Sequence, residues 1–341
     1  MRVALVFDME GVAHIGDVRE PYPTYREYWE SGRAKLADDV VAAVDGLLAG
    51  GASEVFILNH HGAGETEWPN LLVDRLPDEA SLVEDWGTRK LRERVDVMFQ
   101  VGAHARAGRR SFLSHTICPG LRLRVDDELL SESHWWAWTG DVPLLGIVGS
   151  EELGTDLSNG SLRDVPFLAV QRSHSRDKAE PVFGSPGETA AAIEDFAKEA
   201  TRRATDRRVT TPDGPIHLEA SLLNGDAVVD AMAEAGWART GRTSFAIDAD
   251  AWRSEDERID NAIWAAVAAA WIPYSFCFDG IDPASRESAL AYPADRLADL
   301  DAVLRSWSTK DSPEWFEPAD ADGPLEGLDW LAKDGATVPA R

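Results

Sequence analysis

The chain has 341 residues, enough for one large domain or two modest ones, and its 44% apolar and 28% charged content is typical of a globular protein. Its 60 Asp and Glu residues outnumber its 34 Lys and Arg residues, so the formal net charge is −26. A surface this acidic repels nucleic-acid phosphates and anionic lipid, and we therefore expect neither nucleic acid nor a membrane as a partner.

Two further features bear on the compartment. Cys118 and Cys277 are the only cysteines, which excludes a disulfide framework and a thiolate zinc cluster. Asp8 and Glu10 interrupt the first apolar run too early for a signal peptide, and no stretch approaches the roughly 18 apolar residues of a membrane span. We expect a cytoplasmic protein, with its thiols reduced.

Short apolar runs alternate with helical patterns along the first part of the chain. Residues 3–7 form a continuous apolar run, which predicts a strand buried on both faces. Apolar residues at helical spacing predict a helix over 35–48, which two glycines then end. Further strands are predicted over 54–58, 96–101, 141–149 and 165–170, and a helix over 187–203. This alternation predicts an α/β fold, with a mostly parallel sheet flanked by helices.

The second part of the chain predicts additional units. A charged run and a Pro- and Gly-containing turn predict a boundary near residue 208. We predict a catalytic α/β domain over 1–208, a smaller α/β and helical domain over 209–305, and an acidic, Trp-containing C-terminal extension over 306–341. Strands are predicted over 216–222 and 243–247, and helices over 226–235 and 259–271. The aromatic residues of the extension indicate that it docks rather than remaining a disordered tail.

Polar side chains lie at the ends of several predicted strands. Asp8 follows the first strand, a pair of histidines follows the second, His104 follows the third, and Glu132 precedes the fourth. In a parallel sheet the carboxyl ends of the strands form one edge, where ligands bind. Carboxylates and histidines gathered there are the ligands that zinc or a similar divalent ion prefers. Each residue alone also fits an ordinary role, such as a helix cap for Asp8 or an exposed loop for the histidine pair.

Five short motifs in order resemble peptidase family M55, the D-aminopeptidase family. The first is Asp8-Met9-Glu10-Gly11, directly after the opening strand. The others lie at residues 102–107 (Gly-Ala-His-Ala-Arg-Ala), at Ser114-His115, at Glu132 ahead of Asp141-Val142-Pro143, and at residues 170–176. The resemblance runs from residue 1 to about residue 250.

This resemblance implies a centre with two Zn²⁺ ions per subunit and a homo-oligomeric ring, a decamer in the type member. Carried over to this chain, it makes Asp8 the bridging ligand, His115 the catalytic residue, and the remaining ligands Glu10, His61, His104 and Glu132. His61 rather than His60 holds the ligand position, because the family pattern is Asn-Asp-x-His followed by Gly or Ser. No other cofactor is implied.

The chain departs from the family around these residues. Leu58-Asn59 replaces the Asn-Asp pair, Ser131 replaces a glycine, and Gln171 replaces a lysine. Unchanged ligands in altered surroundings indicate the same metal chemistry with an altered substrate. The tryptophans that follow Glu132 fit a pocket wall and a core or subunit contact equally well: Trp135, Trp136 and Trp138.

We therefore expect a zinc-dependent aminopeptidase or amidase acting on a small peptide or amide. Two metal ions would activate a water molecule and polarise the scissile carbonyl, while His115 transfers a proton or stabilises the oxyanion. One alternative is an amidase that uses the same centre on a non-peptide metabolite. A second alternative is a non-catalytic scaffold that has kept the fold, although retention of all the ligands and His115 argues against it.

Overall fold

The computed structural model describes residues 1–21, 26–61, 69–83, 91–106, 109, 111–116, 121–125, 128–140, 142–158, 160–175, 178–204, 215–220, 238–239 and 244–248. The predicted extension over 306–341 and the predicted helices over 226–235 and 259–271 lie outside these residues.

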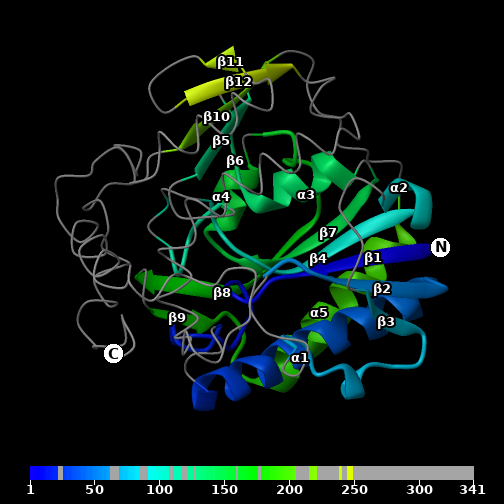
Figure 1. The fold of residues 1–341 in the computed structure, drawn as a ribbon. Helices are drawn as coiled ribbons and strands as arrows, with labels where there is room; N and C mark the ends of the chain where they lie inside the picture. Colours follow the sequence, from blue (N-terminus) through cyan, green and yellow to red (C-terminus); the bar gives the residue numbers. More distant parts are fainter. Residues whose placement is uncertain are drawn as a thin grey trace, which may run out of the picture.

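Seven strands form the central sheet, in the order β3-β2-β1-β4-β7-β8-β9 (Figure 1). They are β1 (Arg2–Phe7), β2 (Glu54–Asn59), β3 (Ala80–Val83), β4 (Val97–Ala103), β7 (Leu144–Ser150), β8 (Phe167–Ser175) and β9 (Lys178–Pro181). Every neighbouring pair is parallel except β8 and β9, which pair antiparallel. The mostly parallel α/β fold expected from the sequence is confirmed.

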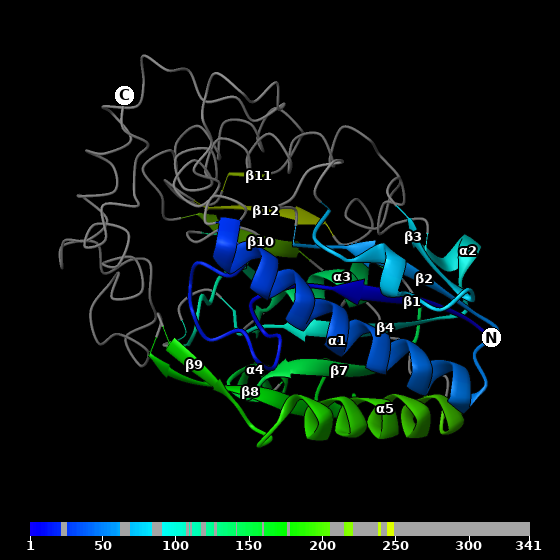
Figure 2. The same ribbon diagram turned by 90° about the horizontal axis from the view of Figure 1, so that it is seen from below.

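Helices cover both faces of this sheet. The long helices α1 (Arg26–Gly50) and α5 (Pro186–Arg202) pack side by side along one face (Figure 2), and α3 (Glu132–Gly140) lies on the other (Figure 1). Shorter helical segments are η1 (Val73–Arg75), α2 (Leu91–Arg94) and α4 (Leu153–Leu157). No helix in the described parts of the chain combines the length and apolar character needed to cross a membrane.

The ends of the two long helices follow from local sequence. Helix α5 begins after Ser185, whose hydroxyl accepts a hydrogen bond from the backbone N–H of Glu188 at 3.3 Å. Helix α1 ends at Gly50, and Gly51, which follows it, has a φ of +112° and donates its N–H to the carbonyl of Leu48. The N–H of Ala52 reaches back to the carbonyl of Leu47, which completes a Schellman motif.

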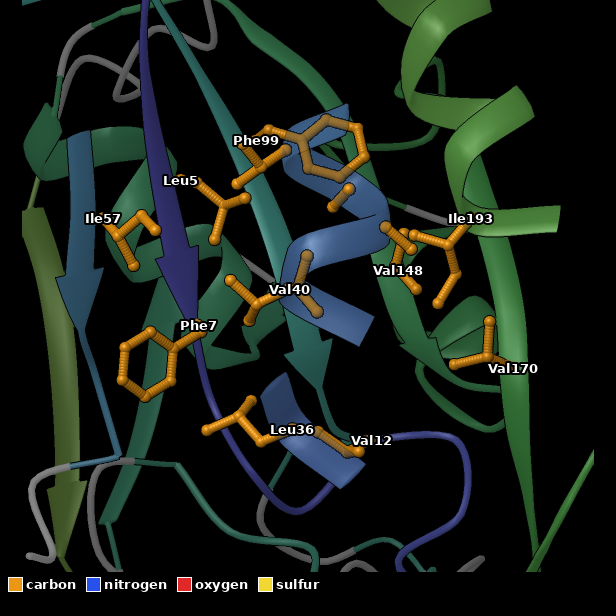
Figure 3. Packing of buried hydrophobic residues seen from close by; sticks show 14 of the residues in the cluster. Leu5, Phe7, Val12, Leu36, Val40, Ile57, Phe99, Val148, Val170 and Ile193 are labelled. Carbon is orange, nitrogen blue, oxygen red and sulfur yellow. The ribbon is translucent and has the colours of Figure 1, made fainter. Parts of the chain in front are cut away.

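The apolar core lies between the sheet and helices α1 and α5. In Figure 3, Leu5 and Phe7 of β1, Val40 of α1 and Ile193 of α5 belong to one packed cluster. Residues 3–7 are all buried, as expected for a central parallel strand covered on both faces. This rigid core holds the strand ends that carry the candidate site.

A second sheet of five antiparallel strands has the order β11-β12-β10-β5-β6. Its strands are β5 (Leu121–Val125), β6 (Glu128–Leu130), β10 (Pro215–Ala220), β11 (Ala238–Arg239) and β12 (Ser244–Asp248). It thus joins two strands from the predicted domain over 1–208 to three from the predicted domain over 209–305. Helix α3 lies between the two sheets (Figure 1). The proposed boundary at residue 208 stays a prediction.

The strand order places a topological switch point at the centre of the parallel sheet. From β1 the chain adds β2 and β3 on one side, and then β4, β7 and β8 on the other. In open α/β sheets, ligands bind beyond the carboxyl ends of the strands at such a point. Here these are the ends of β1 and β4.

Candidate metal centre

The six side chains predicted for the site converge at this carboxyl edge. They come from the segments after β1, β2 and β4 and from the first residue of α3, and all six are buried. His60, which the family resemblance does not make a ligand, joins them. We refer to the seven residues as the carboxylate–histidine cluster: Asp8, Glu10, His60, His61, His104, His115 and Glu132.

Asp8 lies between two histidines of the cluster. Its Oδ2 is 3.3 Å from Nε2 of His104, and its Oδ1 is 3.1 Å from Nδ1 of His61. The same His61 nitrogen is 3.0 Å from Oε2 of Glu10. Asp8 is therefore placed to share both of its oxygens between neighbouring groups, as a bridging ligand would.

Glu132 contacts the same nitrogen of His104 as Asp8 does. Its Oε2 is 3.5 Å from Nε2 of His104, and its Oε1 is 3.5 Å from Nε2 of His115. Glu132 is the first residue of α3, where the partial positive charge of the helix N-terminus favours a carboxylate. The backbone N–H of Ser131 bonds Nδ1 of His134 at 3.2 Å, so His134 takes the place of the usual capping-box glutamate.

Three histidines of the cluster are each oriented by a backbone carbonyl. His61 donates from Nε2 to Pro21 at 2.7 Å, and His104 donates from Nδ1 to Ala105 at 2.9 Å. His115 donates from Nδ1 to Leu113 at 2.7 Å. A carbonyl only accepts, so the donating nitrogen carries hydrogen, and in a neutral ring the other nitrogen presents a lone pair to the carboxylates.

Backbone contacts fix the distance between Asp8 and His104. Gly102 has a φ of +77°, and a Cβ on it would lie 2.0 Å from the carbonyl oxygen of Asp8. The N–H of Gly11 donates to the carbonyl of Gly102 at 2.8 Å. Because the two segments are in direct contact, only glycine fits at position 102.

Gln171 holds the loop that carries Glu10. Its side-chain nitrogen lies 2.8 to 3.0 Å from three backbone carbonyl oxygens, those of Glu10, Val12 and Ile15. Its side-chain oxygen is buried without a hydrogen-bond partner. At the position of the family lysine, therefore, a neutral amide supplies the donors that this loop requires.

The charges of the cluster stabilise one another. Burial alone would raise the pKa of Asp8, but the neighbouring rings of His104 and His61 outweigh it and hold that pKa well below its usual value. Burial would likewise raise the pKa of Glu132, but the neighbouring histidines, His60 first, lower it. In return the carboxylates raise the pKa of His60, and raise those of His61 and His104 well above the usual value, although burial opposes this.

The cluster has the composition and geometry of a metal site. Among the described residues, three sets of side chains have ligand atoms close enough together to hold an ion: Asp8 with Glu10 and His104; His104 with His115 and Glu132; and Asp8 with His60 and Glu132. Nε2 of His104 is buried without a hydrogen-bond partner, although it faces two carboxylates. This nitrogen fits a metal ligand better than a structural hydrogen-bonding group.

A small cavity of about 20 Å³ lies against the cluster. Asp8, His60, His104 and Glu132 line it together with Trp136, and it is large enough for a water molecule or an ion. Trp136 thus forms part of the wall of the site, which agrees with the interpretation of the tryptophans as a pocket wall. Trp135 is also buried, and the side chain of Trp138 lies outside the described part of the structure.

Comparison with known proteins decides the family. The model of the family Peptidase_M55, D-aminopeptidase, matches residues 1–254, which include the whole cluster. The chain belongs to peptidase family M55. No curated protein sequence matches this M55 member.

A solved structure has the same fold as this M55 member. It is the Zn-dependent D-aminopeptidase DppA from Bacillus subtilis, described as a self-compartmentalizing protease. The two chains are 20% identical, with a TM-score of 0.63, and the match covers 78% of this chain and 98% of the other. At this identity the likeness establishes the fold.

Proposed function

We propose that this M55 member is a zinc-dependent hydrolase that cleaves the amide bond of D-aminoacyl peptides or amides at a dinuclear centre. The observation that carries the proposal is His104. Its Nδ1 is bound to a backbone carbonyl, and its Nε2 is buried, has no hydrogen-bond partner and faces Asp8 and Glu132. A bound cation would satisfy all three groups.

The distances from His104 to the two carboxylates support a bound metal ion. Nitrogen and oxygen ligands about 2.0–2.1 Å from one zinc ion, at tetrahedral angles, lie about 3.3–3.4 Å from each other. The contacts of His104 with Asp8 and Glu132 are 3.3 and 3.5 Å. Both exceed the 2.7–2.9 Å or so of a charge-assisted N–H···O hydrogen bond. The spacing is that of ligands around an ion.

We assign Asp8 as the bridging ligand and Glu10, His61, His104 and Glu132 as the remaining ligands. Three buried carboxylates close to one another are unfavourable unless cations neutralise them. A set of two histidines and three carboxylates suits zinc, while also accepting manganese or cobalt. The fold shared with a protein described as Zn-dependent supports zinc.

The chain's own residues would orient the substrate and move protons. A zinc pair in such a centre supplies an activated water molecule and polarisation of the scissile carbonyl. His115 is held through Nδ1 by Leu113, stacks on His104 with ring centroids 4.2 Å apart, and directs Nε2 towards Glu132. From there it would donate a proton to the leaving amine or stabilise the oxyanion. Leu113 itself has a φ of +47°, a strained conformation of the kind often found at functional sites.

We further propose that the protein acts as a homo-oligomer, with a decamer as the expectation from the family resemblance. The shared fold with a self-compartmentalizing protease supports assembly. Sedimentation analysis tests this: a decamer would have ten times the 37.3 kDa mass of the chain. A monomer at all concentrations would contradict the proposal.

Turnover of a matched substrate panel tests the activity. The panel consists of D-aminoacyl amides, D-dipeptides, their L enantiomers and non-peptide amides, each assayed with and without a zinc chelator. We expect hydrolysis of the D compounds, with loss of activity in chelator and recovery on adding zinc. Turnover of non-peptide amides alone would make the protein an amidase with the same centre. A zinc-loaded protein that hydrolyses nothing would support the scaffold alternative.

A further inference from the structure

His60 differs from the other histidines of the cluster in the partners of its ring nitrogens. Its Nε2 contacts Oε2 of Glu132, and its Nδ1 accepts a hydrogen bond from the indole N–H of Trp136. The imidazole and indole rings meet edge-on, with centroids 5.0 Å apart and an interplanar angle of 81°. Its side chain is 17% exposed, so it is accessible as well as bonded on both sides.

The partner of Nδ1 determines which nitrogen of His60 carries hydrogen. An indole N–H can only donate, so Nδ1 of His60 must supply the lone pair. In the form that fits Trp136, Nε2 carries the hydrogen and donates it to Glu132.

His60 is therefore the reverse of the three histidines that bond backbone carbonyls. His104, for example, donates from Nδ1 to Ala105 and keeps its Nε2 lone pair directed at the carboxylates. His60 presents a hydrogen to the same region, and a nitrogen that carries hydrogen cannot bind a metal ion. The side chain is suited to binding a ligand of the metal rather than the metal.

We propose that His60 is a positioning residue, held by Trp136, that donates a hydrogen bond to Glu132 and fixes this carboxylate for metal binding. The inference rests on the proposed metal centre and adds two residues to it. Partners behind metal ligands orient the ligands and tune their affinity.

The geometry of helix α3 makes this arrangement rigid. Glu132 and Trp136 are four residues apart, so they lie on the same face of the helix, one turn from each other. His60 spans the two side chains, and its own backbone N–H donates to the carbonyl of Phe7 at 3.0 Å. The end of β2 is thereby tied both to β1 and to the helix that supplies Glu132. Oε1 of Glu132 stays directed at His115 and Oε2 at His104.

Zinc titration of the metal-free protein against a competing chelator tests the proposal without reference to activity. We expect His60→Ala to weaken the affinity for one ion about 10- to 100-fold while both ions still bind. His60→Gln should recover most of the loss, because its amide N–H can donate to Glu132. Trp136→Phe should cause a smaller loss than His60→Ala. Trp135→Phe is the matched control, with the same atoms removed from the neighbouring residue of α3, and should leave both affinities unchanged.

Three results would overturn the inference. Unchanged zinc affinity in His60→Ala would mean that His60 does not act on Glu132. Complete loss of one ion in His60→Ala, with no recovery in His60→Gln, would make His60 a metal ligand instead. A wild-type protein that binds no zinc would overturn the proposed function as well, which distinguishes that failure from the first two.

Discussion

The carboxyl edge of the parallel sheet and the middle of helix α1 each bury an aspartate, Asp8 and Asp39. Burial raises the pKa of both carboxyl groups, yet the net shifts are opposite. Asp8 has histidines on both oxygens, which hold its pKa well below the usual value. For Asp39, burial and the neighbouring charge of Asp38 raise the pKa to about 7. The hydrogen bond that it accepts from the backbone N–H of Ala13, at 2.9 Å, offsets only part of this rise.

The difference separates a site built for positive charge from one that tolerates a neutral acid. The cluster around Asp8 keeps carboxylates ionised in the interior, which costs free energy unless cations or protonated histidines compensate. Asp39 avoids the cost of a buried charge by taking up a proton instead. Its contact with Ala13 supports the loop behind the cluster. Perturbed carboxylates are found in functional and structural roles alike, and the partners distinguish the two.

Loss of Asp8 should have the largest effect. In the proposed centre, Asp8→Ala removes a ligand from both metal ions and leaves the remaining carboxylates to repel each other, so we expect metal content and hydrolysis to fall together to background. Elemental analysis and the substrate panel measure the two quantities. Asp39→Asn is the control, a buried aspartate changed outside the cluster, and should keep both. An Asp8→Ala protein with full metal content would place the centre elsewhere.

The second largest effect should come from substituting one of the two adjacent histidines, His61. His61 directs Nδ1 at Asp8 and Glu10, whereas His60 reaches Glu132 with a nitrogen that carries hydrogen. His61→Ala should therefore lower metal occupancy and reduce activity far more than His60→Ala does. For His60→Ala, the loss of activity should stay within about 10- to 100-fold. If His60→Ala proves the more damaging variant, the ligand assignment at the end of β2 is off by one residue.

His115→Ala should affect the reaction but leave the metal in place. We expect both ions to remain bound while kcat falls about 10²- to 10⁴-fold, the usual contribution of general acid–base catalysis. Steady-state kinetics and metal analysis on the same preparation check this. An unchanged kcat would limit His115 to a structural contact, and loss of metal would make it a ligand.

The smallest effect concerns stability at Asp39. With its pKa moved from 3.8 to about 7, the folded protein holds a proton that the unfolded chain has released between about pH 4 and pH 7. The contribution of Asp39 to the free energy of unfolding therefore falls as the pH rises through this window and is constant above it. Asp39→Asn removes this fall, so its stability relative to wild type should increase from pH 4 to pH 7, by at most about 4 kcal/mol.

Urea denaturation of both proteins at several pH values, in the same metal-free state, measures this difference. If the difference in free energy of unfolding between the two proteins stays constant from pH 4 to pH 7, the pKa of Asp39 in the fold is not raised.

The parallel sheet was predictable because its strands have a strong signal. The apolar run over residues 3–7 could be placed in a central strand, while β3 and β9 lie at the sheet edges and are short and mixed in character. β5 could have been recognised, because Leu121–Val125 alternates apolar and charged residues with the period of a strand. The antiparallel sheet it joins depends on pairing with β10, nearly a hundred residues later, which local patterns do not encode.

The site was predictable where it follows strand ends and not where it depends on side-chain direction. Asp8 and His104 could be placed at one edge from the strand pattern alone. The choice between His60 and His61 could not be made from periodicity, because it depends on Trp136, contributed by a helix beyond β4. Asp39 gave no signal either, since an aspartate in a long helix is usually exposed.

Metal analysis of the purified protein tests the central claim most directly. Elemental analysis, combined with activity before and after complete removal of metal, measures both the content of the centre and its necessity. We expect close to two divalent ions per chain, mainly zinc, with activity lost on removal and restored by adding zinc. A metal-free protein that retains full activity would contradict it.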